Sequence, residues 1–309
     1  TGVQTCALPI YVFERRIGLW PAGYDADGEL FCNQRYGDWP CTTEQFRKNV
    51  WAEPEWMLLS YGKAACASSA EDGKGPEKAV DENVRSWWKA ATAEPGEWLA
   101  IDLGHICDVH AVQVNFADDA LNGEDYPAIA ERSRVAMEFM VGDASVRRWI
   151  DTEHQPTRWK LEISMDGECW SVLEDKREAD TDLPHDLVVR EDGVQARYVR
   201  LTVFSLPYGQ RACVSGLRVF GRAEGEKPAP VERFNCRADG ELDLYLDWSG
   251  MATGYVVNWG FAPDKLYHSY MVFEPKVHLG GLVKGQKLWA RVDSFNETGI
   301  TEGAVQPLR

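Results

Sequence analysis

Alternation of apolar and polar residues is the clearest pattern in this chain. In residues 198–204, aliphatic side chains at positions 199, 201 and 203 alternate with larger or polar ones. Alternation with a period of two predicts a strand with one buried face. A Pro-Tyr-Gly turn follows at 207–209, and a short apolar run follows at 217–220. The stretch therefore predicts two strands joined by a loop over 205–214.

Strand-like runs of this kind recur through the middle of the chain, with turn residues between them. They are residues 97–104, 110–117, 159–175, 185–192, 196–204 and 215–221. Residues 125–153 break the pattern and are expected to form an insertion with a short helix. Many short strands without intervening helices predict an all-β fold, either a β-sandwich or a jelly roll.

Composition shifts divide the chain into segments. Residues 1–10, "TGVQTCALPI", resemble a translated sequencing adapter and are excluded from fold reasoning. Residues 11–57 hold two short strand pairs, too few for a core of their own, so we expect them to pack poorly or against the next segment. Residues 58–222 form the largest unit, and 223–230 are a Pro/Gly/Glu linker. Residues 231–309 show a second series of alternating strands.

Charge and cysteine content exclude some functions and leave others open. The formal net charge is -16, which argues against nucleic-acid and anionic-membrane partners because both need clustered Lys and Arg. No apolar run approaches the roughly 20 residues of a membrane span. The eight Cys lie in no metal-binding spacing, and we expect most of them to be buried, with one disulfide as an open alternative. The thirteen Trp supply either core mass or stacking surface for flat ligands.

The order of motifs in residues 58–222 resembles a discoidin domain, also called a coagulation-factor type C or galactose-binding-like domain. The matching parts are "ASSAEDGKGPEKAVDENVRSWWKA", "GEWLAIDLG", "ISMDGECW" and "RYVRLTV…SGLRVFG". The resemblance implies a jelly-roll β-sandwich whose loops at one rim bind ligands.

Two further resemblances flank this segment. Residues 231–309, with Trp248 on an early strand and a late "LWARVDSFNETG", resemble a fibronectin type III domain. Residues 11–57, "RRIGLWPAGYDADGELFCNQRYGDWP" and onward, resemble the end of a family-43 glycoside hydrolase β-propeller. That resemblance implies an upstream propeller domain in the same protein that would carry the catalytic carboxylates. The acidic residues of the remnant are expected to be turn residues: Asp25, Asp27, Glu29 and Asp38.

A sugar offers C–H bonds on its ring face and hydroxyl groups around it, so a sugar site combines aromatic side chains with polar neighbours. The candidate carbohydrate-binding residues are Trp87, Tyr208, Arg211 and Tyr126, with Trp149 and His154 as weaker ones. The resemblance places Trp88 inside, which leaves Trp87 at the rim. The alternatives are that Trp87 packs against the inserted loop and that Tyr208 lies in a solvated turn. Trp98, Trp170 and Phe220 are predicted core residues.

Sugar-binding members of the resembled family often carry a structural calcium ion beside the loop that corresponds to "DENVRSWW". The resemblance implies oxygen ligands from Asp81, Asn83 and Ser86. The family pattern also has a Glu just before the last strand, where this chain has Gly216. The alternative is that Asp81 and Asn83 form an Asx turn. No other cofactor is expected.

Together the patterns predict a non-catalytic, carbohydrate-binding accessory region of a glycoside hydrolase that acts on plant cell-wall glycans of the xylan or arabinan type. The alternatives are a protein-docking or adhesion module and a structural spacer without a ligand. The resemblance favours an extracellular or periplasmic location for the parent protein.

Overall fold

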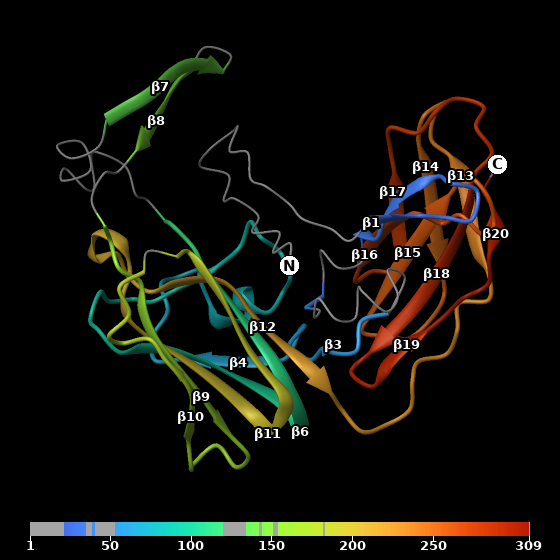
Figure 1. The fold of residues 1–309 in the computed structure, drawn as a ribbon. Helices are drawn as coiled ribbons and strands as arrows, with labels where there is room; N and C mark the ends of the chain where they lie inside the picture. Colours follow the sequence, from blue (N-terminus) through green and yellow to red (C-terminus); the bar gives the residue numbers. More distant parts are fainter. Residues whose placement is uncertain are drawn as a thin grey trace.

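The computed structural model describes residues 22–34, 39–40, 53–119, 134–141, 144–150, 154–181 and 183–308. The secondary-structure elements that lie wholly in these ranges are β-strands and two short 3-10 helices, η2 (Pro76–Ala79) and η3 (Pro207–Gly209). The all-β prediction is therefore confirmed (Figure 1). Among the described residues, no helix has the length and apolar character needed to cross a bilayer.

The middle domain is built on one eight-stranded antiparallel sheet. Its strands are β3 (Met57–Leu58), β4 (Ala64–Ala67), β5 (Trp88–Lys89), β6 (Glu97–Phe116), β9 (Arg158–Ser164), β10 (Ser171–Asp175), β11 (His185–Ser205) and β12 (Cys213–Arg222). Two long strands, β6 and β11, pair with each other, and their pairing shifts register at two points. Such irregularities bend a strand, which lets a single sheet curl around one core.

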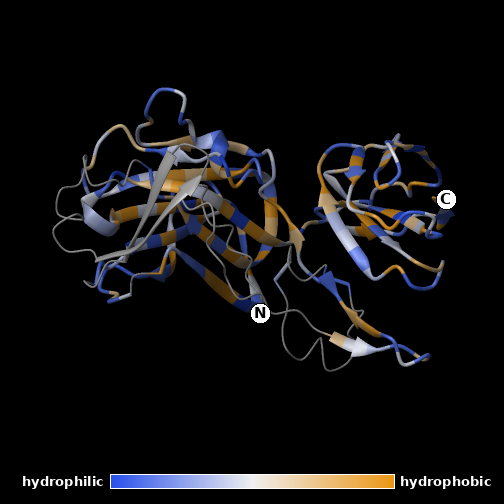
Figure 2. Ribbon diagram, turned by 90° about the horizontal axis from the view of Figure 1, so that it is seen from above, coloured by the Kyte–Doolittle hydropathy of each residue, from blue (hydrophilic) through white to orange (hydrophobic). Residues whose placement is uncertain are grey.

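The alternation predicted for residues 198–204 is confirmed. Val199, Leu201 and Val203 are buried in the core of the middle domain, whereas their neighbours on the other face of β11 are half-buried. The core also receives Leu99, Ile101 and Leu103 of β6. Hydrophobic and hydrophilic residues alternate along the strands in Figure 2. Leu206 and Ala212, near the two ends of the loop between β11 and β12, are buried in the same core.

The insertion forms a hairpin and not the expected short helix in its described part. Strand β7 (Arg134–Val141) pairs with β8 (Ala144–Ile150) in a separate two-stranded sheet, which stands off the main sheet in Figure 1. Both strands contain β-branched and aromatic residues, a composition that favours strands.

The C-terminal domain is a sandwich of two antiparallel sheets. One contains β13 (Phe234–Ala238), β14 (Leu244–Trp248) and β17 (Lys276–Leu279). The other contains β15 (Gly254–Gly260), β16 (His268–Val272), β18 (Trp289–Asn296), β19 (Gly299–Thr301) and β20 (Gln306–Pro307). Trp248, Tyr255 and Val292 lie in the core between them. Because several families share this architecture, the fibronectin type III assignment stays a prediction.

The two domains share an apolar cluster, which we call the interface cluster. Its buried members are Trp39, Trp56, Met57, Leu58, Ala111, Phe220, Val256, Phe295 and Ile300. The rings of Tyr61 and Phe273 stack across the same boundary with centroids 3.8 Å apart. Within the linker, Ala229 accepts a hydrogen bond from Ser294 through its carbonyl oxygen (2.7 Å). The domains therefore meet through packed side chains, and the linker lies against β18.

The N-terminal hairpin, β1 (Ala22–Tyr24) and β2 (Leu30–Cys32), packs against the C-terminal domain. Trp39 and Trp56 of the same N-terminal segment pack against the middle domain instead, where they contact Phe220 and His110. The Tyr267 hydroxyl donates to Asp25 (2.6 Å), and the ammonium of Lys265 lies within 3.1 Å of the carboxylates of Asp25, Asp27 and Glu29. The bond from Tyr267 is the largest cause that holds the pKa of Asp25 below its usual value. Asp25 is a turn residue, as expected, because its carboxylate accepts from the N–H groups of Asp27 and Glu29. The contact with Lys265 was not expected, and Asp38 lies outside the described residues.

The six described cysteines are free, and only two of them, Cys107 and Cys213, are buried. The expectation that most cysteines are buried is therefore wrong for this part of the chain. Burial raises the pKa of the Cys213 thiol to about 12 and that of the Cys107 thiol to about 11. Thiols with such values stay protonated and unreactive at neutral pH.

Candidate functional site

Two loops and the short strand β5 of the middle domain meet at one rim. The backbone N–H of Glu71 donates to the carbonyl oxygen of Lys89 (2.9 Å), and the N–H of Lys89 donates to the carbonyl oxygen of Lys74 (3.1 Å). The N–H of Ala90 donates to the carbonyl of Ala212 (2.9 Å). Backbone bonds thus hold the loop at 68–74, strand β5 and the loop at 206–212 side by side, and the side chains of these segments form a continuous surface.

Trp87 is the aromatic residue of this rim. It is half-buried, and part of its side chain packs against the core of the middle domain. The Lys74 ammonium lies over the ring, 3.4 Å from the centroid. The indole N–H faces the Asp119 carboxylate but makes no well-formed hydrogen bond. An ammonium held against an aromatic face in this way is a cation–π contact.

An ion network joins Trp87 to Arg211. The Lys89 ammonium lies 2.8 Å from Asp119 and 3.2 Å from Glu71. Glu71 also accepts a hydrogen bond from Arg211 (2.9 Å). Burial alone would raise the pKa of Asp119, but the bond and charge of Lys89 outweigh burial, so this pKa lies below its usual value. The predicted residues Trp87 and Arg211 are therefore brought together through a network of charged side chains, here called the rim network: Glu71, Lys74, Lys89, Asp119 and Arg211.

Tyr208 lies on the same loop as Arg211 but has different contacts. Its backbone N–H donates to Gln155 (3.2 Å), and its backbone is left-handed, with φ 62°. A left-handed backbone is unfavourable for a residue with a side chain, and such strain often marks functional loops. Tyr208 is half-buried, so it is available to a ligand only in part.

The other predicted site residues fall outside this rim network. Tyr126 lies outside the described residues, and for Trp149 only the backbone is described. His154 pairs with the exposed carboxylate of Asp180 at 3.0 Å. Sequence reasoning missed most of the rim network and also Gln210, which is buried and donates to Asp118 (3.1 Å). The one local feature of the sequence that indicates these residues is the pair Asp118-Asp119, which directly follows an apolar strand.

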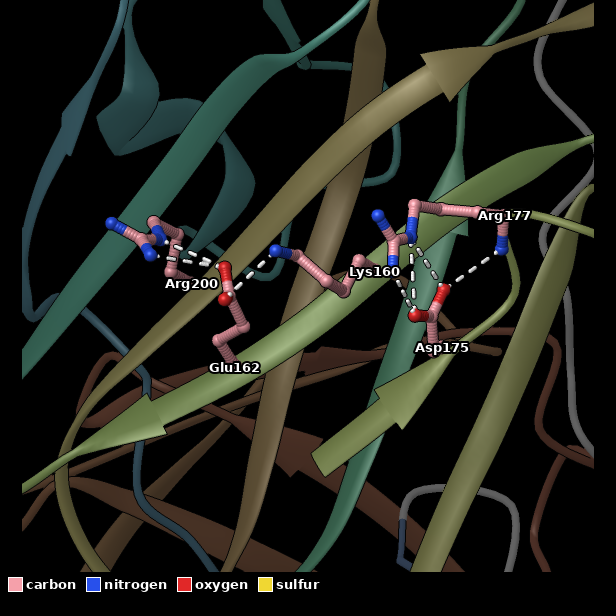
Figure 3. A network of polar contacts seen from close by, with 5 residues as sticks. All are labelled: Lys160, Glu162, Asp175, Arg177 and Arg200. Atoms are coloured by element: carbon pink, nitrogen blue, oxygen red, sulfur yellow. Dashed lines mark hydrogen bonds and ion pairs between the residues drawn. The ribbon is translucent and has the colours of Figure 1, made fainter. Parts of the chain in front are cut away.

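Three aromatic residues are predicted for the core of the middle domain. Trp98 and Trp170 lie outside it, and Phe220 lies in the interface cluster. Trp98 is half-buried on the outer face of β6, opposite Thr202. Trp170 is also half-buried, and its ring stacks under the Arg200 guanidinium at 3.9 Å. Phe220 is fully buried, but in the interface cluster. Figure 3 shows the charged residues on this outer face, where Lys160 and Arg200 share Glu162 and Arg177 pairs with Asp175.

The side-chain oxygens of the predicted calcium ligands accept or donate hydrogen bonds within their own loop. One carboxylate oxygen of Asp81 accepts from the N–H of Asn83 (2.8 Å), and the other accepts from the Ser86 hydroxyl (2.5 Å). The side-chain oxygen of Asn83 accepts from the N–H of Arg85 (3.1 Å). No group of three or more His, Cys, Asp or Glu among the described residues could hold a metal ion. The loop forms the alternative Asx turn.

A guanidinium supplies a positive charge beside this loop. Arg218 of β12 donates to Glu82 (2.9 Å) and to Gln113 (3.0 Å). Both partners of the pair are largely buried, with exposed side-chain fractions of 15% for Arg218 and 11% for Glu82. Glu82 itself has a left-handed backbone, with φ 55°. Arg218 thus ties the loop that carries Trp87 to the last strand of the sheet.

We expect Arg218→Met to lower the free energy of unfolding by about 3 kcal/mol, because the substitution leaves the buried Glu82 carboxylate unpaired. We also expect the thermal midpoint of the unchanged protein to be the same in calcium and in EDTA. Differential scanning fluorimetry measures both. Arg222→Met is the matched control, because Arg222 lies on the same strand in an exposed pair with Glu55. A rise of several degrees in the midpoint with calcium would contradict this account.

Comparisons with known proteins return structures but no family. No protein-family model matches the chain. No curated protein matches it either. Several solved structures overlap about half of it.

One is a Clostridium perfringens family-32 module in complex with GlcNAc-alpha-1,4-galactose, with 11% identity, a TM-score of 0.39, and coverage of 55% of this chain and 97% of that one. A second is the family 32 CBM from C. perfringens NanJ in complex with galactose. It has 15% identity and a TM-score of 0.37, and the match covers 53% of this chain and 98% of that one. A third is chitosan-binding module 2 of a Paenibacillus sp. IK-5 chitosanase/glucanase in complex with chitotriose. It has 18% identity and a TM-score of 0.37, and the match covers 53% of this chain and 99% of that one. With TM-scores below 0.5, these similarities establish neither a family nor a ligand for this chain.

Proposed function

We propose that this chain binds carbohydrate, without catalysis, at the rim formed by Trp87, Arg211 and the rim network. One observation carries the proposal: a half-buried indole ring and several charged side chains share one surface at the loop end of the sheet. An indole face matches the C–H bonds of a sugar ring, and carboxylate, guanidinium and ammonium groups bond to its hydroxyls.

The network also suits weak and specific binding. Its charged groups already bond to one another, so a sugar hydroxyl must replace an existing bond, and the net gain per contact is small. We expect a single site of modest affinity. In a longer protein such a site would raise the effective concentration of the glycan near a linked enzyme.

The wider assignment is part of the same proposal. We propose that residues 58–222 are a discoidin-like module, that 231–309 are fibronectin-like, and that 11–57 belong to a family-43 glycoside hydrolase. The parent enzyme would then act on xylan- or arabinan-type glycans outside the cytoplasm. The turn-forming role of Asp25 supports the absence of catalysis in the remnant, and the curled sheet with a loop rim supports a discoidin-like module.

A plant-glycan array with isothermal titration calorimetry tests the proposal. We expect oligosaccharide binding that falls at least about tenfold in Trp87→Ala, because stacking on an aromatic ring contributes about 1–3 kcal/mol. Trp170→Ala is the matched control, since it removes a half-buried tryptophan from the outer face of the sheet. The proposal fails if no glycan binds, or if Trp170→Ala abolishes binding while Trp87→Ala does not. The first result would favour a protein-docking module or a spacer.

A further inference from the structure

One cation beside Trp87 differs from the others in its contacts. Three cations, Lys74, Lys89 and Arg211, lie beside two carboxylates, Glu71 and Asp119. Glu71 is shared by Lys89 and Arg211, and Asp119 pairs with Lys89. Within the part of the chain that the structure describes, Lys74 forms no ion pair, and its ammonium contacts the indole ring of Trp87. Lys74 is therefore the one cation of the rim network without an ion pair among the described residues, in a chain whose formal net charge is -16.

The outer face of the sheet shows how this chain treats cations elsewhere. There the Lys160 ammonium lies 2.9 Å from Glu162, and Arg200 donates to the same carboxylate at 3.0 Å (Figure 3). Arg177 pairs with Asp175 at 2.6 Å. Arg200 also stacks on an indole ring, that of Trp170. The arginine above a tryptophan on that face thus has a carboxylate in direct contact. Lys74 contacts the ring and acts on Asp119 through its charge, without an ion pair among the described residues.

Lys74 also occupies the surface that a sugar needs. Part of the Trp87 side chain packs against the core of the middle domain, and the Lys74 ammonium lies over the ring. A sugar ring that stacks on Trp87 must therefore displace the ammonium from the ring face. A neutral sugar would remove the cation–π contact and give Lys74 no ion partner in return. A sugar with its own carboxylate would give the displaced ammonium a charge-assisted hydrogen bond.

We propose that the rim selects a uronic acid residue over its neutral counterpart, with the ring on Trp87 and the carboxylate on Lys74. This inference rests on the proposed carbohydrate-binding function. The carboxylate gives the displaced ammonium of Lys74 an ion partner. Lys74 is the specificity-determining residue, because it penalises neutral rings and rewards acidic ones.

The net charge of the whole chain further limits the class of ligand that the rim can bind. A protein with a formal charge of -16 repels a continuous polyanion over a distance of about one Debye length, roughly 8 Å at physiological salt. A single uronate on an otherwise neutral glycan avoids most of that repulsion. The favoured ligand class is therefore a neutral oligosaccharide with an isolated uronic acid substituent, and not a homopolymer of uronic acids.

Calorimetry with two matched probes tests this inference on the full chain. The first probe is xylotriose with one 4-O-methylglucuronic acid substituent, and the second is the same oligosaccharide after reduction of the carboxyl group to a primary alcohol. We expect the acidic probe to bind at least about tenfold more tightly, as one charge-assisted hydrogen bond provides. The ratio should fall towards one in Lys74→Met and should decrease with added NaCl. Lys176→Met is the control, because Lys176 pairs with Glu174 elsewhere in the same domain.

The outcomes separate this inference from the proposed function. Equal or tighter binding of the reduced probe by the unchanged protein overturns the uronate preference and leaves carbohydrate binding intact. An acidic preference that survives in Lys74→Met overturns the role of Lys74. If neither probe binds and the plant-glycan array is also blank, both proposals are wrong. A loss of the preference in Lys74→Met together with an unchanged thermal midpoint supports the inference.

Discussion

Substitution of Trp88 by alanine is expected to lower the free energy of unfolding by about 3–5 kcal/mol, as for other buried aromatic residues. The Trp88 side chain is fully buried in the core of the middle domain. Its indole N–H donates to the carbonyl of Ser69 (2.9 Å), which fixes the loop that carries Glu71 and Lys74. The substitution therefore leaves a cavity, an unpaired carbonyl and a loosened rim. Urea unfolding followed by tryptophan fluorescence measures the change.

The conservative variant Trp88→Phe separates the two causes. It retains most of the volume and loses the bond to Ser69, so we expect a loss of about 1 kcal/mol from the missing hydrogen bond and a smaller packing defect. The adjacent Trp87→Ala should cost less stability than Trp88→Ala because Trp87 is only half-buried. Equal losses for the two alanine variants would contradict the assignment of Trp88 to the core and Trp87 to the rim.

Substitution of Asp293 by alanine is expected to destabilise the C-terminal domain by about 3–5 kcal/mol, because the change leaves buried donors without an acceptor. Asp293 has no exposed surface. It lies 2.7 Å from Arg291 and accepts hydrogen bonds from Asn258 (2.7 Å) and from the N–H of Gly303 (3.0 Å). Burial alone would lower the pKa of Arg291, but the charge of Asp293 outweighs burial and raises it.

Asp247→Ala is the matched control, since Asp247 is an exposed carboxylate of the same domain that accepts a bond from Asn235. We expect that variant to change the free energy of unfolding by less than about 0.5 kcal/mol. The double variant Asp293→Leu with Arg291→Met should recover part of the loss, because an apolar pair can replace a buried ion pair. Thermal and urea midpoints check these expectations. An Asp293→Ala midpoint equal to that of Asp247→Ala would show that the buried carboxylate is dispensable.

The part of the fold that depends on local alternation could be predicted from the sequence. The period of two in residues 198–204 separates a buried face from an outer one, and the structure agrees. The same rule, applied more strictly, would have placed Trp98 correctly. Trp98 shares its face with Asp102, while Leu99 and Ile101 lie on the opposite, buried face. A large aromatic side chain is not by itself evidence for a core position.

The contacts between distant segments could not be predicted from the sequence. Glu71 and Arg211 are 140 positions apart, and the pair exists because backbone bonds hold their loops together. The N-terminal hairpin reaches Lys265 and Tyr267 of another domain. No periodicity or spacing encodes such pairs. The left-handed residue Glu82 likewise has a distant partner, Arg218.

The central claim is that Trp87, at the loop rim, contacts the ligand. Nuclear magnetic resonance of the indole N–H groups in a nitrogen-15-labelled chain, titrated with the 4-O-methylglucuronic acid xylotriose, tests it directly. The chain has thirteen Trp, and Trp87→Phe assigns the signal of Trp87. The account predicts that the Trp87 signal moves to saturation while the signals of Trp170 and Trp248 stay in place. Movement of the Trp170 or Trp248 signal with a stationary Trp87 signal would contradict it.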